Sequence, residues 1–340
     1  MNVDELKQIA QAMVAPGKGI LAMDESHPTC AKRFKKLGIP ETEEMRQAYR
    51  DMLVTTTGLS DYISGAILFD ETIRQNLLDG TPFPQYLSEN GIIPGIKVDA
   101  GAKVLAGHED EKVTEGLDGL RDRFAEYYKL GARFSKWRAV ITIGDRIPSW
   151  ACIEANAHAL ARYAALSQEA GIVPIVEPEV LMDGTHSIER SYEVTELAQR
   201  ITFQHLRNQG VLMEGMVLKP SMVISGADAS NRADVETVAR ETVRCLLNTV
   251  PASVPGIAFL SGGQTDEEAS AHLNAMHNLG IDLPWGLTFS YGRALQQAAM
   301  TAWNGKSENV QAAQEKLLQR ARCNGKAALG DYSPDMEAAA

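Results

Sequence analysis

Short runs of apolar and β-branched residues recur along the chain, each bounded by glycine or proline. They cover residues 19–25, 61–71, 91–99, 132–140, 171–180, 213–222, 256–263 and 284–290. A run of this length between turn residues is typical of a strand that is buried on both faces. The pattern therefore predicts eight strands.

Longer stretches with apolar residues at helical spacing separate the strands. The clearest cover residues 115–131, 154–171, 187–210 and 232–250. The first three stop at a glycine, which is a common helix end because glycine adopts the left-handed conformation freely. Residues 1–13 have the same amphipathic spacing and predict an extra helix before the first strand.

The alternation of eight strands with helices in a chain of 340 residues predicts an α/β fold with a single closed (β/α)8 barrel, or TIM barrel. We place the barrel at residues 1–326 and expect a mobile, flexible C-terminal tail at residues 327–340, where the helical period is lost. The alternative is an open, doubly wound nucleotide-binding sheet. It is disfavoured because no G-x-G-x-x-G follows the first strand.

Charged residues lie within or just after several predicted strands, toward their C-terminal halves. They are Asp24, Lys97, Asp99, Lys136, Arg138, Glu177, Glu179 and Lys219. A lone charge in a dry interior is costly, so these groups must be paired or hydrated. We therefore predict one shared polar cavity at the carboxyl ends of the strands, where barrel active sites lie. For any one pair, an outward-facing ion pair under the helices is the alternative.

Lys219 differs from the other strand lysines because apolar residues and Pro220 flank it, whereas Lys97 and Lys136 each have a second charge two positions away. Desolvation and neighbouring cations lower the pKa of a lysine and so favour its neutral, nucleophilic form. Lys219 is our first candidate for a Schiff base with a carbonyl substrate, and Lys136 is the second. The alternative is a strand-end lysine whose amine reaches solvent.

Two glycine-containing loops follow the last two predicted strands. The first contains Ser261, Gly262 and Gly263, and the second places Gly292 before Arg293. Glycines let backbone N–H groups approach a phosphate, and the dipole of a following helix adds positive potential. Phosphate sites after the seventh and eighth strands recur in such barrels. The two loops therefore favour a phosphorylated substrate over plain turns.

The charge balance and the cysteine and histidine spacing exclude several classes of function. The net charge is −11, so we expect neither nucleic acid nor a membrane surface as a partner. The four cysteines lie far apart and the seven histidines form no H-E-x-x-H, so we expect neither a disulfide framework nor a metal site. No secretory signal and no membrane-spanning run is found, and the expected location is the cytoplasm.

Seven longer motifs carry a family resemblance. They read GKGILAMDES, GIKVD, SKWRAV, IVPIVEPEVL, VLKPSMV, FLSGGQT and LTFSYGRALQ, in order between residues 17 and 297. This series resembles the class I fructose-bisphosphate aldolases. The resemblance implies a (β/α)8 lyase that forms a Schiff base on a lysine and uses no metal or other cofactor. It also implies a homo-oligomer, commonly a tetramer.

The resemblance also implies residue roles near the scissile bond. Lys219 resembles the imine-forming lysine, and Glu177 the principal general acid and base. Asp24 and Lys136 resemble the groups that assist carbinolamine formation and carbon–carbon cleavage, and Glu179 resembles a supporting acid.

Two phosphate positions follow from the same resemblance. The cradle for the ketose 1-phosphate is implied at Ser261, Gly262, Gly263, Ser290, Gly292 and Arg293. The neighbourhood of the 6-phosphate is implied at Ser26, Thr29, Lys97 and Arg138.

The implied reaction is reversible cleavage of fructose 1,6-bisphosphate into dihydroxyacetone phosphate and glyceraldehyde 3-phosphate, a step of glycolysis and gluconeogenesis. Fructose 1-phosphate and sedoheptulose 1,7-bisphosphate are alternative substrates, because specificity for the distal end can lie in loop packing. Two further hypotheses are a non-catalytic barrel that binds sugar phosphates and a metal-dependent aldolase.

Two segments depart from the family pattern. His27 and Pro28 stand where the animal members usually have small residues, and Thr29 replaces a serine. We expect Pro28 to stiffen this loop. The chain also ends in MEAAA instead of the tyrosine that exchanges the enamine proton in many members. Tyr332 is the only tyrosine in the tail, and we assign it no catalytic role.

Overall fold

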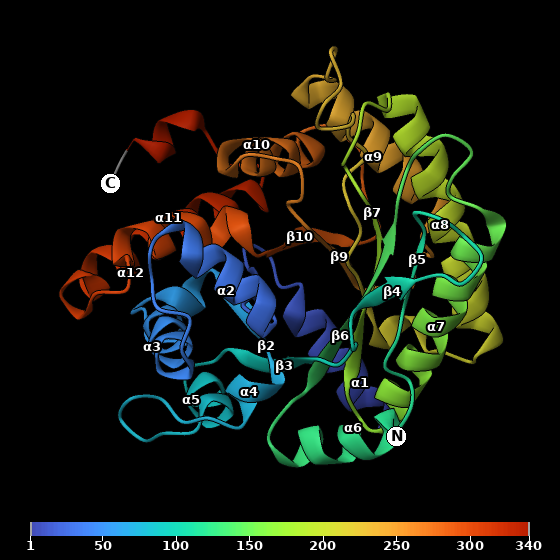
Figure 1. The fold of residues 1–340 in the computed structure, drawn as a ribbon. Coiled ribbons are helices and arrows are strands. Elements are labelled where there is room, and N and C mark those ends of the chain that lie inside the picture. The colour runs from blue at the N-terminus through green and yellow to red at the C-terminus, as the bar shows by residue number, and fades with distance from the viewer. Residues whose placement is uncertain (1, 339–340) are drawn as a thin grey trace.

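Eight parallel strands close into a barrel in the computed structural model, which describes residues 2–338 (Figure 1). They are β1 (Gly19–Ala22), β2 (Ile63–Leu68), β3 (Ile93–Lys97), β6 (Phe134–Ile141), β7 (Val173–Val180), β8 (Val217–Leu218), β9 (Gly256–Phe259) and β10 (Gly286–Tyr291). Their order is β1-β10-β9-β8-β7-β6-β3-β2, and β1 pairs with both β10 and β2. Every predicted strand is present, so the predicted (β/α)8 barrel is confirmed.

Helices surround the barrel (Figure 1). They are α1 (Val3–Met13), α2 (His27–Lys36), α3 (Glu43–Val54), α4 (Asp70–Ile73), α5 (Phe83–Glu89), α6 (Leu120–Lys129), α7 (Trp150–Glu169), α8 (Ile188–Asn208), α9 (Val235–Thr249), α10 (Asp266–His277), α11 (Arg293–Trp303) and α12 (Val310–Ala327). Within residues 2–338, no helix is both long and apolar enough to cross a membrane.

The structure differs from the sequence prediction between β3 and α6. Strands β4 (Ala102–Val104) and β5 (Lys112–Thr114) form an antiparallel hairpin that was not predicted. The helix expected from residue 115 begins only at Leu120, because Gly116 and Gly119 have φ values of 125° and 66° and form a turn first.

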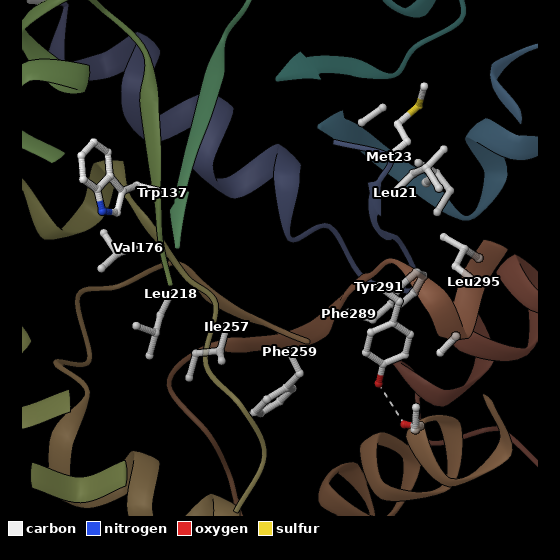
Figure 2. Close-up of a cluster of buried hydrophobic side chains, with 14 of the residues drawn as sticks. Leu21, Met23, Trp137, Val176, Leu218, Ile257, Phe259, Phe289, Tyr291 and Leu295 are labelled. Carbon is white, nitrogen blue, oxygen red and sulfur yellow. Dashed lines mark hydrogen bonds between the residues drawn. The ribbon is translucent and has the colours of Figure 1, made fainter. Parts of the chain in front are cut away.

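Alternate residues of several barrel strands belong to two different apolar layers. Leu21 and Val176 lie in the layer between the barrel and the helices, where Figure 2 shows them with Trp137. Their chain neighbours Ile20 and Ile175 lie in a separate cluster inside the barrel. This alternation explains why the strands read as continuous apolar runs, since both faces are buried.

Helix α1 closes the amino end of the barrel. Its Leu6, Ala10 and Met13 are fully buried and share the interior cluster with Phe134 of β6. Phe134 fills the barrel so closely that a Cβ added to Gly95 would lie 2.2 Å from its ring. The predicted N-terminal helix therefore seals the amino end of the barrel with apolar side chains.

The C-terminal segment lies against α10 and α12. Tyr332 is buried, and its backbone N–H donates to Asn274 Oδ1 at 2.9 Å. Glu337, in the 3-10 turn Pro334–Glu337, accepts a hydrogen bond from Tyr332 OH at 3.0 Å. The expected mobility of residues 327–340 stays a prediction, and residues 339–340 lie outside the described part of the chain.

Candidate active site

A cavity of about 430 Å³ opens at the carboxyl ends of the barrel strands. Charged and polar side chains from β3, β6 and β7 and from the segments that follow β1, β8, β9 and β10 line it. Every site residue predicted from the sequence lines this cavity except Gly263. The structure thus brings the charged strand residues together instead of placing them outward under the helices.

Four buried charged residues form a continuous row at the centre of the cavity. Lys136 Nζ lies 2.6 Å from Asp24 Oδ2 and 3.6 Å from Glu177 Oε2. Glu177 Oε1 lies 3.3 Å from Lys219 Nζ. Negative and positive groups alternate along these four residues, which we call the charge row. Each charge therefore has an opposite neighbour that offsets its loss of hydration.

The strands place the charge row by their pairing and their two-residue period. Lys136 of β6 and Glu177 of β7 lie on strands that pair in parallel along their whole length. Ile175 lies in the interior cluster, so Glu177 two residues later also points inward. Lys219 follows β8 directly, and its N–H donates to Val176 O at 2.8 Å, which extends the ladder by one residue.

Electrostatics fix the protonation of two members of the charge row. Burial alone would raise the pKa of Asp24, but Lys136 and Lys219 lower it to about 2. Burial alone would lower the pKa of Lys136, but Asp24 and Glu177 raise it above its usual value. Lys136 therefore stays protonated at neutral pH, which disfavours it as an attacking amine.

Glu177 has one oxygen free for a ligand. Its Oε1 faces Lys219, whereas its Oε2 is buried and has no hydrogen-bond partner among the described residues. Lys136 Nζ, 3.6 Å away, lies beyond hydrogen-bond reach. A buried oxygen without a donor is costly, and a substrate hydroxyl or a water at this position would satisfy it. A general acid or base must lie within hydrogen-bond reach of the substrate group with which it exchanges a proton, and an oxygen free for a substrate hydroxyl meets this requirement.

The loops after β9 and β10 line the part of the cavity where the sequence predicts a bound phosphate. Ser261 and Gly262 precede α10, and Gly292 is the N-cap of α11, whose first turn has no side-chain cap. Ser290 Oγ is buried and has no partner among the described residues. Backbone N–H groups at a helix start attract anions, and Arg293 adds a permanent positive charge.

Gly263 is the predicted phosphate residue that does not line the cavity. Its φ is 75°, and a Cβ at this position would lie 2.4 Å from Met182 Cγ. Glycine is therefore needed here for the turn of the loop over Met182. The turn accounts for a glycine at position 263, and a phosphate contact of Gly263 stays a prediction.

Two cations in the cavity wall are paired with carboxylates. Lys97 Nζ lies 2.8 Å from Asp99 Oδ1, and Arg138 Nε donates to Glu179 Oε2. Burial alone would lower the pKa of Arg138, but Glu179 raises it above its usual value. Glu179 therefore holds the guanidinium of Arg138 in place at the cavity wall, and its supporting role in the reaction stays a prediction.

The segment that departs from the family pattern begins helix α2. Ser26 is the N-cap, and Pro28 lies in the first turn, where a missing N–H is tolerated. Ser26 Oγ and Thr29 Oγ1 lie 3.2 Å apart, and both residues line the cavity. His27 Nε2 lies 3.0 Å from Glu71 Oε2. Pro28 therefore stiffens a helix start, not a loop.

Two further charged residues, Arg33 and Glu25, line the cavity and were not predicted from the sequence. Arg33 Nη1 donates a short hydrogen bond to Glu25 Oε1. The available signal was helical spacing: Arg33 is four residues after Thr29, so both lie on one face of α2. The extra guanidinium increases the positive potential available to an anionic ligand.

No three His, Cys, Asp or Glu side chains gather into a metal site anywhere in residues 2–338. The four cysteines are free and buried. The expectation of chemistry without metal or other cofactor stays a prediction.

Known proteins that resemble this chain over nearly its whole length share one family description. A family model described as fructose-bisphosphate aldolase class-I matches residues 5–340. A probable fructose-bisphosphate aldolase class 1 from Xanthomonas campestris pv. campestris is 63% identical, with 98% of this chain and 99% of that protein covered. The chloroplastic fructose-bisphosphate aldolase 3 of Arabidopsis thaliana is 51% identical, covering 98% of this chain and 85% of that protein. A solved structure of fructose-bisphosphate aldolase from Plasmodium falciparum superposes with a TM-score of 0.95 at 49% identity, covering 97% of this chain and 95% of that one. The chain therefore belongs to the class I fructose-bisphosphate aldolase family.

Proposed function

We propose that the protein cleaves fructose 1,6-bisphosphate reversibly through an imine on Lys219. The observation that carries this proposal is the buried charge row, in which Glu177 Oε1 lies 3.3 Å from Lys219 Nζ. Lys136 pairs with both Asp24 and Glu177 and is held protonated, whereas Lys219 pairs with Glu177 alone among the described residues, so we assign the attack to Lys219. A barrel that only bound sugar phosphates would not need a buried lysine against an acid.

The reaction begins when Lys219 gives a proton to Glu177, 3.3 Å away, and the resulting neutral amine attacks C2 of the ketose, forming a carbon–nitrogen bond as the carbonyl π bond opens onto oxygen. A proton then passes from the nitrogen to the C2 oxygen, which gives the hydroxyl of the carbinolamine. Glu177 donates the proton with which the C2 hydroxyl leaves as water, and the nitrogen becomes an iminium. Lys136, which stays charged, stabilises the negative charge that develops on the C2 oxygen during attack.

Cleavage follows because the iminium accepts an electron pair. Glu177 Oε2, which has no hydrogen-bond partner among the described residues, removes the proton from the C4 hydroxyl. The C3–C4 bond then breaks, its electrons form the C2–C3 double bond of a neutral enamine, and glyceraldehyde 3-phosphate leaves. Protonation of C3 and hydrolysis of the resulting imine release dihydroxyacetone phosphate and restore the free amine of Lys219.

Two phosphates bring about four negative charges into an acidic protein. We place the 1-phosphate on the loops that contain Ser261, Gly262, Gly292 and Arg293, where N–H groups and helix starts converge. We place the 6-phosphate beside Lys97 and Arg138, which would exchange part of their carboxylate pairing for the phosphate.

Substrate comparison with EDTA present tests the proposal. We expect cleavage of fructose 1,6-bisphosphate to be unaffected by EDTA, and kcat/KM for fructose 1-phosphate to be lower by about 10- to 100-fold, since one to two charge-assisted hydrogen bonds are lost. Equal values for the two ketoses would show that Lys97 and Arg138 read no second phosphate. Loss of activity with EDTA would indicate a metal-dependent aldolase, and binding without turnover a non-catalytic barrel.

We also propose a cytoplasmic homo-oligomer, with the tetramer supported by membership of the family. Four buried, unpaired thiols fit a reducing compartment. Light scattering coupled to size-exclusion chromatography would measure the assembly, and a monomer at working concentration would contradict this part of the proposal.

A further inference from the structure

Arg320, on α12, is a buried cation that does not line the substrate cavity. Its Nε donates to Ala294 O at 3.2 Å, and its Nη2 donates to Asp266 O at 2.7 Å and to Ser270 Oγ at 2.8 Å. One guanidinium therefore joins α12 to both α10 and α11, two of the helices against which α12 packs (Figure 1).

The two backbone carbonyls belong to the first turns of the helices that follow the phosphate loops. Asp266 is the first residue of α10, four positions after Gly262, and Ala294 follows Arg293 at the start of α11. A guanidinium is planar and rigid, so it fixes the distance between its acceptors better than a flexible ammonium would. The separation of the two helix starts is thereby set from behind the cavity.

We propose that Arg320 is a positioning residue for the 1-phosphate site, because it holds the starts of α10 and α11 at the spacing at which both loops contact one phosphate. This inference rests on the proposed function. Arg320 acts through the loops and touches no substrate atom. Small misplacements of binding groups cost large factors in affinity or rate, so the effect of this residue is felt at the phosphate.

The C-terminal segment completes this support. Glu337 Oε1 accepts from Arg320 Nη1 at 2.5 Å and from Tyr332 OH at 3.0 Å. Gln319 Nε2 holds the backbone of the same residue, donating to Glu337 O at 2.7 Å. A buried cation without a counter-charge is costly, so Glu337 keeps the guanidinium in place. The tail thus contributes to phosphate binding without entering the cavity.

Two ligands that differ only in the phosphate test this role. The rate of inactivation by borohydride is measured at increasing concentrations of dihydroxyacetone phosphate or of dihydroxyacetone. The concentration that gives half of the maximal rate is the half-saturating concentration of that ligand. We expect Arg320→Lys to raise this concentration by about 10-fold for the phosphorylated ligand, as expected for one lost charge-assisted hydrogen bond, and to leave it unchanged for dihydroxyacetone. Arg322→Lys, at an exposed position of the same helix, is the matched control and leaves both values unchanged.

A second variant keeps the test decisive if Arg320→Lys does not fold. Glu337→Gln preserves the shape of the side chain and removes the counter-charge, and we expect a rise of about 3-fold for dihydroxyacetone phosphate alone. Thermal unfolding shows which variants are folded at the assay temperature.

The selectivity for the phosphorylated ligand decides the outcome. Equal rises for both ligands would indicate a general structural role and overturn the proposal, as would wild-type values in the folded variants. If the wild-type protein shows no inactivation that depends on dihydroxyacetone phosphate, the proposed function fails and this inference falls with it. That result is seen before any variant is made.

Discussion

The two ends of the barrel use the same strands for opposite purposes. On the inward face of β6, Phe134 fills the amino end and Lys136 follows one layer further on. Strand β7 repeats this change with Ile175 and Glu177. Two residues along a strand therefore separate close apolar packing from a buried ion pair.

This difference separates stability from chemistry. Removing apolar surface from water stabilises the fold, and the amino end does so with α1 as a seal. Buried ion pairs add little net stability, because the attraction between the charges is offset by their desolvation. Replacing Lys219 leaves Glu177 beside Lys136, and replacing Glu177 leaves Lys136 paired with Asp24. We therefore expect these two substitutions to change activity with modest effects on folding, and substitutions at the amino end to do the reverse.

Lys219→Met is expected to have the largest effect. The change removes the attacking amine, so kcat/KM for fructose 1,6-bisphosphate falls by at least about 10⁴-fold. The free energy of unfolding in urea changes little, since methionine fills a similar volume without a charge. Lys129→Met, at an exposed position of α6, serves as the control. More than a tenth of wild-type activity in Lys219→Met would contradict the assignment.

Glu177→Gln is expected to lower kcat by about 10²- to 10⁴-fold, the usual contribution of general acid–base catalysis. KM changes less, because the phosphates still bind. Steady-state kinetics check this, with Glu193→Gln on the exposed face of α8 as the matched control. A rise in KM at unchanged kcat would assign Glu177 to binding instead.

Phe134→Ala tests the amino end. Its side chain is fully buried in the interior cluster, so the free energy of unfolding falls by about 3–5 kcal/mol. The folded enzyme keeps its kcat, because the charge row lies one layer away. Urea unfolding measures the free energy of unfolding, and kinetics on the same samples measure kcat. Ile175→Val should lower the free energy of unfolding by a smaller amount, about 0.5–1.5 kcal/mol. A kcat as low as that of Glu177→Gln would show that the two ends are not separable.

Acid sensitivity should arise at the carboxyl end, where His272 Nδ1 lies 2.7 Å from Gln264 Oε1 in the loop after β9. Burial lowers the pKa of His272 to about 4. In the unfolded chain, His272 is protonated around its ordinary pKa of about 6.5. Its contribution to stability is therefore fully present above that pH and is lost as the pH falls toward 4. Between pH 7 and pH 5, the wild type should lose about 2 kcal/mol more than His272→Gln in urea unfolding. Equal losses would show that this histidine is not the source.

The order of apolar and charged residues within a single strand was sufficient to predict the features that depend on that strand alone. Apolar runs predicted the strands, and the charged residues late in those runs, Lys136 and Glu177 among them, predicted one shared polar cavity. The charge of a side chain at a strand end was a usable signal because an unpaired charge is so costly in a dry interior.

The rest depends on tertiary contacts that a local pattern does not carry. Arg33 sits on a helix whose cavity-facing side was not known, and Gly263 forms a turn that reads like a phosphate loop. The pairing of Arg320 with Glu337 joins a helix to a segment without periodicity. Each requires knowing which elements pack together.

Peptide mapping after borohydride reduction in the presence of dihydroxyacetone phosphate tests the imine on Lys219 most directly. We predict one reduced adduct, carried by the peptide that contains Lys219 and absent from Lys219→Met. An adduct on Lys136, or cleavage of fructose 1,6-bisphosphate without any adduct, would contradict the proposed chemistry.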